Sequence, residues 1–199
     1  MTASNAAGTS VASSTVNVTP QASVPFALIG VQSRKFHAGA GEFDVPIDTA
    51  LLITGNVSVE PRAIKAAHRM VFQFNGPVTL PGTASTVDVN NMSIGNVGGT
   101  IAQSSDVIVT LTNIPDASRV KVTLTNVNGA GVGGQASIGF LVGDMNQTGR
   151  VNAADVSGVK AHAAQTANGS NFRFDANSDG NVDAKDVSIV KARAGWGLP

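Results

Sequence analysis

The sequence contains no cysteine, which excludes disulfides, a thiolate nucleophile and any zinc site that needs cysteine. Tyrosine is also absent, and a single tryptophan accompanies eight phenylalanines. Charged residues make up 13% of the 199 residues, and 13 basic side chains balance 13 acidic ones. The chain therefore lacks the basic excess of nucleic-acid binders and membrane-surface proteins, and no apolar run approaches the ~18 residues of a membrane helix. We expect neither nucleic acid nor a membrane as a partner.

Charge is missing altogether from residues 1–24, which are almost entirely Ala, Ser, Thr, Val, Asn and Gly. This composition is typical of a linker or tail. The placement of Val11, Val16 and Val18 nevertheless favours an extended strand. The first ten residues show neither the basic nor the apolar region of a secretory signal.

Residues 25–141 form a series of short β-type runs, each bounded by Gly, Pro, Asn or Asp. The runs are FALIGVQ, FDVPI, ALLITGNVSV, MVFQFNG, STVDVN, DVIVTLTNI, RVKVTLTNV and ASIGFLV. Met70, Phe72 and Phe74 alternate with other residues and so share one face of a strand. We predict a mainly β fold, an antiparallel sandwich or jelly roll, over this segment.

Residues 142–199 differ in composition from the preceding segment and contain an internal duplication. The segment that starts at Asp144 matches the one that starts at Asp175 at 12 of 21 positions, with an offset of 31 residues. Such a repeat predicts that this part of the chain is a separate module. We therefore divide the chain into segments 1–24, 25–141 and 142–199.

Each repeat opens with a twelve-residue loop that has oxygen-bearing residues at positions 1, 3, 5, 9 and 12, a backbone carbonyl at 7 and glycine at 6. The first set is Asp144, Asn146, Thr148, Arg150, Asn152 and Asp155; the second is Asp175, Asn177, Asp179, Asn181, Asp183 and Asp186. Calcium prefers six to eight oxygen ligands, and the sharp turn needs glycine. We predict two calcium ions, and tighter binding in the second loop because it has more carboxylates.

Only the segment after each loop has a helical pattern, with Val156 and Val159 in one repeat and Val187 and Val190 in the other. A duplicated loop followed by one helix resembles the dockerin family over residues 142–199. The resemblance implies calcium in both loops and helices that dock onto a cohesin, which is a β-sandwich. We therefore predict a sandwich followed by a small α-helical, calcium-binding, dockerin-like module.

The repeats differ from many dockerins at loop positions 10 and 11, where a hydroxyl pair is common. Here these positions are Ala153-Ala154 and Ala184-Lys185, so the partner's identity stays open. The repeated Lys160 and Lys191 fit either a partner contact or solvated helix lysines. The terminal GWGLP resembles the end clasp of some dockerins, and we expect Trp196 to pack against Phe140 or Leu141.

Other candidate sites are weaker. The three histidines, His37, His68 and His162, lack ligand spacing and are expected at the surface or in local hydrogen bonds. Glu42 with Glu60 or Asp44 would suit a glycosidase pair, but charges on a sandwich surface explain them more simply. The sandwich segment has no Tyr or Trp platform, which disfavours carbohydrate binding without excluding it.

We expect a non-catalytic, extracellular assembly protein with two calcium ions. One chain would contain both a sandwich and a dockerin-like module, so head-to-tail contacts between copies would build a filament. Strand addition by residues 8–20 to a neighbour's sheet is a second route. The alternative is an accessory subunit of a cellulosome-like complex that docks onto a cohesin scaffold, with a sandwich that contacts carbohydrate. A small glycoside hydrolase is the third hypothesis.

Overall fold

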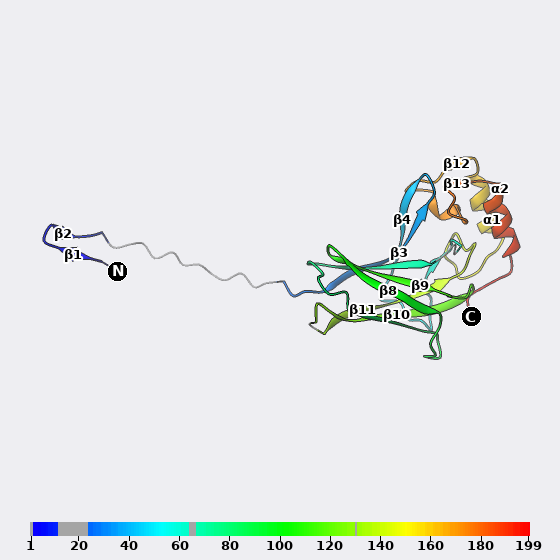
Figure 1. Cartoon of the computed structure of the whole chain (residues 1–199). Coiled ribbons are helices and arrows are strands. Elements are labelled where there is room, and N and C mark those ends of the chain that lie inside the picture. The colour runs from blue at the N-terminus through cyan, green and yellow to red at the C-terminus, as the bar shows by residue number, and fades with distance from the viewer. Residues whose placement is uncertain (1, 12–23, 64–66, 130) are drawn as a thin grey trace.

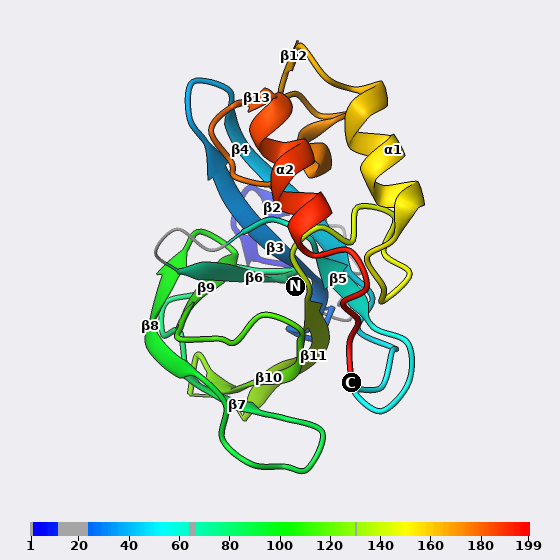
Figure 2. The ribbon, with the colours of Figure 1, turned by 90° about the vertical axis from the view of Figure 1, so that its right-hand side faces the viewer.

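A computed structural model describes residues 2–11, 24–63, 67–129 and 131–199 of the chain. The fold is mainly β, as the sequence predicts, with two helices near the C-terminus (Figure 1). Two sheets face each other to form a sandwich, and the helices lie beside one end of it (Figure 2).

The larger sheet has five antiparallel strands, and its central strands come from three separate parts of the chain. In spatial order it contains β4 (Gly41–Ile47), β3 (Leu28–His37), β6 (His68–Phe74), β9 (Asp106–Thr112) and β8 (Asn96–Gln103). All of its neighbouring pairs are antiparallel.

The smaller sheet departs from the antiparallel prediction at one edge. Its order is β5 (Ser58–Glu60), β11 (Val132–Phe140), β10 (Ser118–Val127) and β7 (Thr83–Val87). β5 runs parallel to β11, whereas β10 is antiparallel to both of its neighbours. A parallel pair needs a long connection, and the chain between β5 and β11 supplies it by building five other strands.

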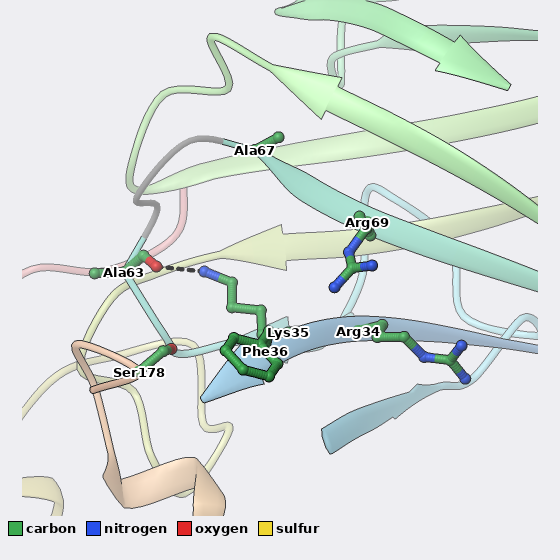
Figure 3. Close-up of a pocket in the computed structure, with 7 residues that line it drawn as sticks. All are labelled: Arg34, Lys35, Phe36, Ala63, Ala67, Arg69 and Ser178. Carbon is green, nitrogen blue, oxygen red and sulfur yellow. Dashed lines mark hydrogen bonds between the residues drawn. The ribbon is translucent and has the colours of Figure 1, made fainter. Parts of the chain in front are cut away.

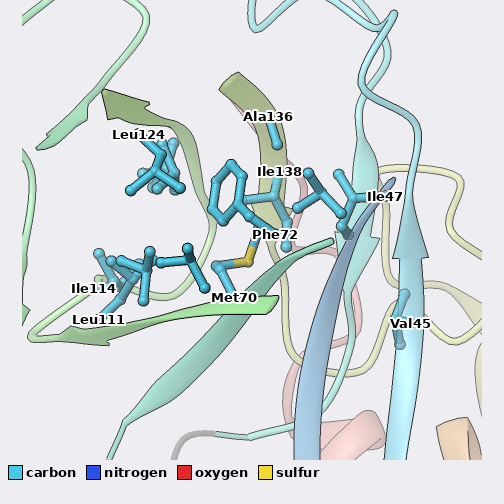
Figure 4. Packing of buried hydrophobic residues seen from close by; sticks show 14 of the residues in the cluster. Val45, Ile47, Met70, Phe72, Leu111, Ile114, Leu124, Ala136 and Ile138 are labelled. Atoms are coloured by element: carbon cyan, nitrogen blue, oxygen red, sulfur yellow. The ribbon is translucent and has the colours of Figure 1, made fainter. Parts of the chain in front are cut away.

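The core lies between the two sheets, because each sheet turns alternate apolar side chains inward. Met70, Phe72 and Phe74 of β6 are buried, as predicted, and face residues of the other sheet such as Leu124 and Ile138 (Figure 4). At roughly 1.5–3 kcal/mol for each buried large apolar side chain, this cluster is the main stabilising term of the sandwich.

One strand prediction was wrong, and one strand was missed. The run at residues 50–59 is strand only from Ser58, and Leu52 is 70% exposed in the turns that precede it. Conversely, β8 was not predicted. It is an exposed edge strand with a bulge between Val97 and Gly99, so it lacks the apolar alternation by which the other strands were found.

The C-terminal part is built from two helices and a short strand pair. Its elements are α1 (Ala153–Ala161), β12 (Gln165–Thr166), η1 (Phe172–Phe174), β13 (Asn181–Val182) and α2 (Ala184–Ala192). β12 pairs with β13. Val159 and Val190 are fully buried between the helices and form a second hydrophobic cluster, together with Val59 and Leu141 of the sandwich.

A bridge fastens α2 to the end of β11. Asp116 accepts hydrogen bonds from the Val142 backbone N–H at 2.9 Å and from Arg193 Nε at 2.8 Å. Because β11 ends at Phe140 and the first loop starts at Asp144, almost no spacer separates the sandwich from the C-terminal part.

At the N-terminus, β1 (Ser4–Asn5) and β2 (Gly8–Thr9) form a small hairpin, and every residue from 2 to 11 is exposed. Most of the predicted strand around Val16 and Val18 lies outside the described residues. In the part of the chain that the structure describes, no helix has the length and apolarity needed to cross a membrane.

Candidate metal centre and docking module

The aspartate at position 1 of each loop organises the first half of that loop. Asp144 accepts the backbone N–H groups of Thr148 at 3.0 Å and Gly149 at 2.7 Å. Asp175 accepts those of Asp179 at 3.1 Å and Gly180 at 2.8 Å. The two loops therefore share one backbone conformation at positions 1, 5 and 6.

The aspartate at position 12 closes each loop and also starts the helix that follows. Asp155 accepts the N–H groups of Asn146 at 3.1 Å and Asn152 at 2.9 Å. In the second loop, Asp186 accepts those of Asn177 and Asp183 at 3.1 and 2.8 Å. Asn152 and Asp183 in turn cap α1 and α2, in complete capping boxes.

Glycine is required at position 6 of both loops. Gly149 has φ of +76° and Gly180 has φ of +92°. Side chains other than glycine rarely adopt this left-handed region. The sequence expectation of a sharp glycine turn is correct in both repeats.

The loop carboxylates are buried without a basic partner in several positions. Asp144, Asp155 and Asp186 are at most 1% exposed, and no ion pair is found for them among the described residues. Burial raises the pKa of Asp144 and of Asp186, against the hydrogen bonds that lower it. Burial thus makes the charged form of these carboxylates costly, and a cation bound in the loop would compensate that charge.

The donor set suits calcium. Both loops offer hard oxygen donors from carboxylates, Asn or Thr side chains and a backbone carbonyl, which is the chemistry that calcium prefers. Among the described residues, however, no three His, Cys, Asp or Glu side chains converge on one point. A calcium ion in either loop therefore depends on amide, hydroxyl and carbonyl oxygens as well.

Loop two holds a lysine at position 11, where loop one has an alanine. Lys185 Nζ lies 3.0 Å from Asp179 Oδ2 and 3.6 Å from Asp183 Oδ2. Burial alone would raise the pKa of Asp179, but hydrogen bonds from Lys185 and from the Asn181 N–H lower it. The equivalent of Lys185 in loop one is Ala154. The two sites are therefore alike in backbone and different in charge.

Residues 142–193 match the family model of the dockerin type I domain. The match covers both loops and both helices, so it agrees with the resemblance inferred from the repeat. We refer to these residues as the dockerin segment. Neither the curated proteins nor the solved structures yielded a match to the chain.

The helices of the dockerin segment expose a small-residue face. Its members are Ala153, Ala154, Ser157, Lys160 and Ala161 on α1, and Ala184, Lys185, Ser188, Lys191 and Ala192 on α2. The two sets correspond through the repeat, and the opposite faces are buried in the second hydrophobic cluster. The two helices therefore expose equivalent surfaces of small and lysine side chains.

The C-terminal residues pack next to the first loop, but Leu198 rather than the expected Trp196 makes the buried contact. Trp196 is 44% exposed and its ring lies under the Arg193 guanidinium, 4.9 Å from ring centroid to Cζ. Leu198 packs instead into the second cluster against Gly139. Backbone hydrogen bonds from Val151 to Trp196 and from Leu198 to Gly149 pin the clasp and turn the indole outward.

Two histidines are placed differently from the sequence expectation. His37 is fully buried and its Nδ1 lies 2.6 Å from Asp175 Oδ2, a contact across 138 residues. His68 is buried against the Phe140 ring, and among the described residues neither of its ring nitrogens has a hydrogen-bond partner. His162 follows the expectation, with Nδ1 2.9 Å from the Gly158 carbonyl.

The carboxylates considered for a glycosidase are held in ion pairs. Asp44 pairs with Arg34 at 2.9 Å, and Glu42 pairs with Arg69 on the same sheet. Glu60 is not a surface charge, since it is 1% exposed and bonded to Arg62. Burial alone would raise the pKa of Glu60, but Arg62 and Lys35 hold it well below its usual range.

A pocket lies where loop two meets the sandwich. It is lined by Arg34, Lys35, Phe36, Ala63, Ala67, Arg69 and Ser178 (Figure 3). In Figure 3 the Lys35 side chain crosses it to the Ala63 carbonyl, and Lys35 Nζ also donates to the Arg62 carbonyl at 2.8 Å. The lysine therefore fastens the chain after β5 to β3.

Sequence reasoning missed this buried polar junction, although β3 contains a signal. Val31, Ser33, Lys35 and His37 alternate along the strand and are all buried, so polar groups occupy the inward face. Buried polar side chains need partners, and here the partners come from residues 60–63 and from loop two.

Proposed function

We propose that this protein is a non-catalytic assembly protein that binds two calcium ions and docks onto another protein through its dockerin segment. The observation that carries the proposal is the duplicated loop. Both repeats show the same hydrogen bonds from the aspartates at positions 1 and 12, and both bury carboxylates that lack a basic partner. Calcium supplies the missing positive charge and stabilises the loops from which the helices start.

The exposed face of α1 and α2 is the surface that we propose for docking. Its small side chains permit close approach of a partner, and Lys160 and Lys191 add positive charge at equivalent positions. The family match favours a cohesin-like β-sandwich as the partner. We also propose an extracellular location, where millimolar calcium would keep such sites loaded.

Copies of the same chain are the second candidate partner. The chain contains a sandwich and a docking segment on different surfaces, and contacts between unlike surfaces propagate as a filament unless they close into a ring. Addition of residues 8–20 to a neighbour's sheet edge is a further contact that we propose, because this stretch is uncharged and its valine spacing favours an extended strand.

The state of the candidate acids supports a non-catalytic role. A glycosidase needs one carboxylic acid and one carboxylate that flank a substrate. Glu42 and Asp44 are instead paired with arginines on the sheet surface, and Glu60 is buried.

Sedimentation velocity with calcium and with chelator tests the docking proposal. We expect either large assemblies of the pure protein in calcium or a monomer that captures a cohesin in calcium. Lys160→Glu with Lys191→Glu should weaken both, whereas Lys121→Glu on the sandwich serves as the matched control. Deletion of residues 2–22 separates the two routes to self-association, since only strand addition needs that segment. A calcium-loaded monomer that binds no cohesin would contradict the proposal.

A further inference from the structure

A chain of four buried side chains connects the sandwich to the second loop. Glu60 accepts two hydrogen bonds from Arg62, at 2.7 Å from Nε and 2.8 Å from Nη2. Arg62 Nη1 contacts His37 Nε2 at 3.0 Å, and His37 Nδ1 contacts Asp175 Oδ2 at 2.6 Å. All four residues are at most 1% exposed. We call them the relay.

The relay determines which ring nitrogen of His37 carries the proton. A guanidinium can only donate hydrogen bonds, so His37 Nε2 must accept from Arg62. The proton of the neutral ring is then on Nδ1, and it is donated to Asp175 Oδ2. Arg62 is itself held by Glu60 and by the carbonyls of Ser33 and Phe43, at 3.1 and 3.0 Å. The orientation of the His37 ring is therefore fixed from the sandwich side.

Loop one has no equivalent of this contact. Asp144 occupies the same loop position as Asp175, and its hydrogen bonds among the described residues come from Thr148 and Gly149 within the loop. The sandwich reaches loop one through a neutral contact, from Gln147 Nε2 to the Val59 carbonyl at 3.1 Å. The duplicated loops thus provide an internal comparison in which only one position-1 aspartate is bonded by the sandwich.

The backbone of loop two is also seated on the sandwich. The Ala63 N–H donates to the Ala176 carbonyl at 2.7 Å, and the Ala38 N–H donates to the Ser178 carbonyl at 3.3 Å. Beside these bonds the Phe172 ring stacks on Phe43 with centroids 5.2 Å apart. These backbone hydrogen bonds and the ring stack therefore fix the position of loop two next to His37.

We propose that His37 is a positioning residue for calcium in loop two, so that the sandwich raises the calcium affinity of this loop and not of loop one. The inference rests on the proposed calcium function. His37 holds Asp175 Oδ2, while Oδ1 accepts only the Asp179 N–H among the described residues and so keeps a lone pair for a cation. Partners that orient a ligand typically change metal affinity by about 10–100-fold.

Calcium titration calorimetry on the full chain tests this, with one loop disabled at a time. Asn146→Ala removes an exposed ligand of loop one and leaves loop two to be measured; Asn177→Ala does the reverse. We expect His37→Ala to lower the calcium affinity of loop two by about tenfold or more and to leave loop one within about twofold. His37→Asn retains a donor close to the position of Nδ1 and should recover most of the loss.

Phe172→Leu is the matched control. The Phe172 ring stacks on Phe43 and also packs against His37 and the Arg62 guanidinium, so the variant weakens the packing around the relay and removes none of its hydrogen bonds. It should lower the melting temperature and leave both affinities nearly unchanged. Equal losses in both loops, or a Phe172→Leu variant that loses as much calcium affinity as His37→Ala, would show a general structural role and overturn the inference. If His37→Ala does not fold, the His37→Asn and Phe172→Leu pair decides: the inference requires loop two to bind calcium at least as tightly in Phe172→Leu as in His37→Asn, and weaker binding by Phe172→Leu overturns it. Absence of calcium binding by the unmodified chain would overturn the proposed function itself, a result distinct from an unselective His37 effect.

Discussion

At the scale of single residues, buried polar groups concentrate where the sandwich meets loop two. Glu60, Arg62 and His37 satisfy one another there, and removal of any one would leave a buried charge or donor without a partner. His68 is the exception, because both of its ring nitrogens are buried and unpartnered among the described residues. It is a buried polar residue whose role is packing against Phe140.

His68 should make the protein less stable in mild acid. Burial and the Lys35 charge lower the pKa of His68 from 6.5 to about 3. Between these values the unfolded chain binds a proton that the folded chain does not, so the stabilisation is complete above pH 6.5 and falls with pH. At pH 5 the loss is about 2 kcal/mol. The free energies of unfolding of the unmodified chain and of His68→Leu are measured with denaturant at pH 7.5 and at pH 5. Between these pH values the unmodified chain should lose about 2 kcal/mol more than the variant. A difference that does not change with pH would contradict the assignment.

The glycines at position 6 should tolerate substitution unequally. Alanine at either position incurs the left-handed penalty of about 1–2 kcal/mol. At Gly149 the added Cβ meets nothing closer than Leu198 Cδ1 at 3.9 Å, whereas at Gly180 it overlaps the Ala38 carbonyl oxygen of the β3–β4 turn. Thermal unfolding should therefore show a clearly larger loss for Gly180→Ala than for Gly149→Ala. Equal losses would mean that loop two is not seated against the sandwich.

At the scale of elements, the repeat made the loops and helices predictable. Spacing alone located the two loops, their glycine turns and the buried valines, because these contacts are local and the pattern occurs twice. The edge strand β8 and the contact of β3 with loop two were not predictable in this way. β8 is exposed and rich in glycine, so it leaves no periodic signal. The alternation along β3 marks a buried polar face but not its partner, because His37 meets Asp175 across 138 residues.

The two loops should differ in calcium affinity. Loop two contains four carboxylates against two in loop one, and its position-1 aspartate is held by His37. Asp175→Ala should therefore reduce both calcium affinity and melting temperature more than Asp144→Ala does. Calorimetry and thermal unfolding of the two variants in calcium provide the measurement. Losses of the same size would show that neither the number of carboxylates nor the sandwich contact determines which loop binds calcium more tightly.

At the scale of the whole molecule, the dockerin segment is packed onto the sandwich rather than tethered to it. The Asp116 bridge, the relay and the Leu198 clasp all join parts that lie far apart in the sequence. The face that we propose for docking is exposed on both helices, whereas their opposite faces are buried in the second hydrophobic cluster. The sandwich therefore constrains the orientation of the segment for which we propose calcium binding.

The calcium stoichiometry of the intact chain tests the central claim most directly. Native mass spectrometry at micromolar free calcium should show two ions for each chain, and one ion for each of the single variants Asn146→Ala and Asn177→Ala. The same titration in magnesium should show markedly weaker loading, because magnesium demands a tighter octahedral site. A chain that keeps its metal-free mass, or that binds one ion in the absence of any substitution, would contradict the account.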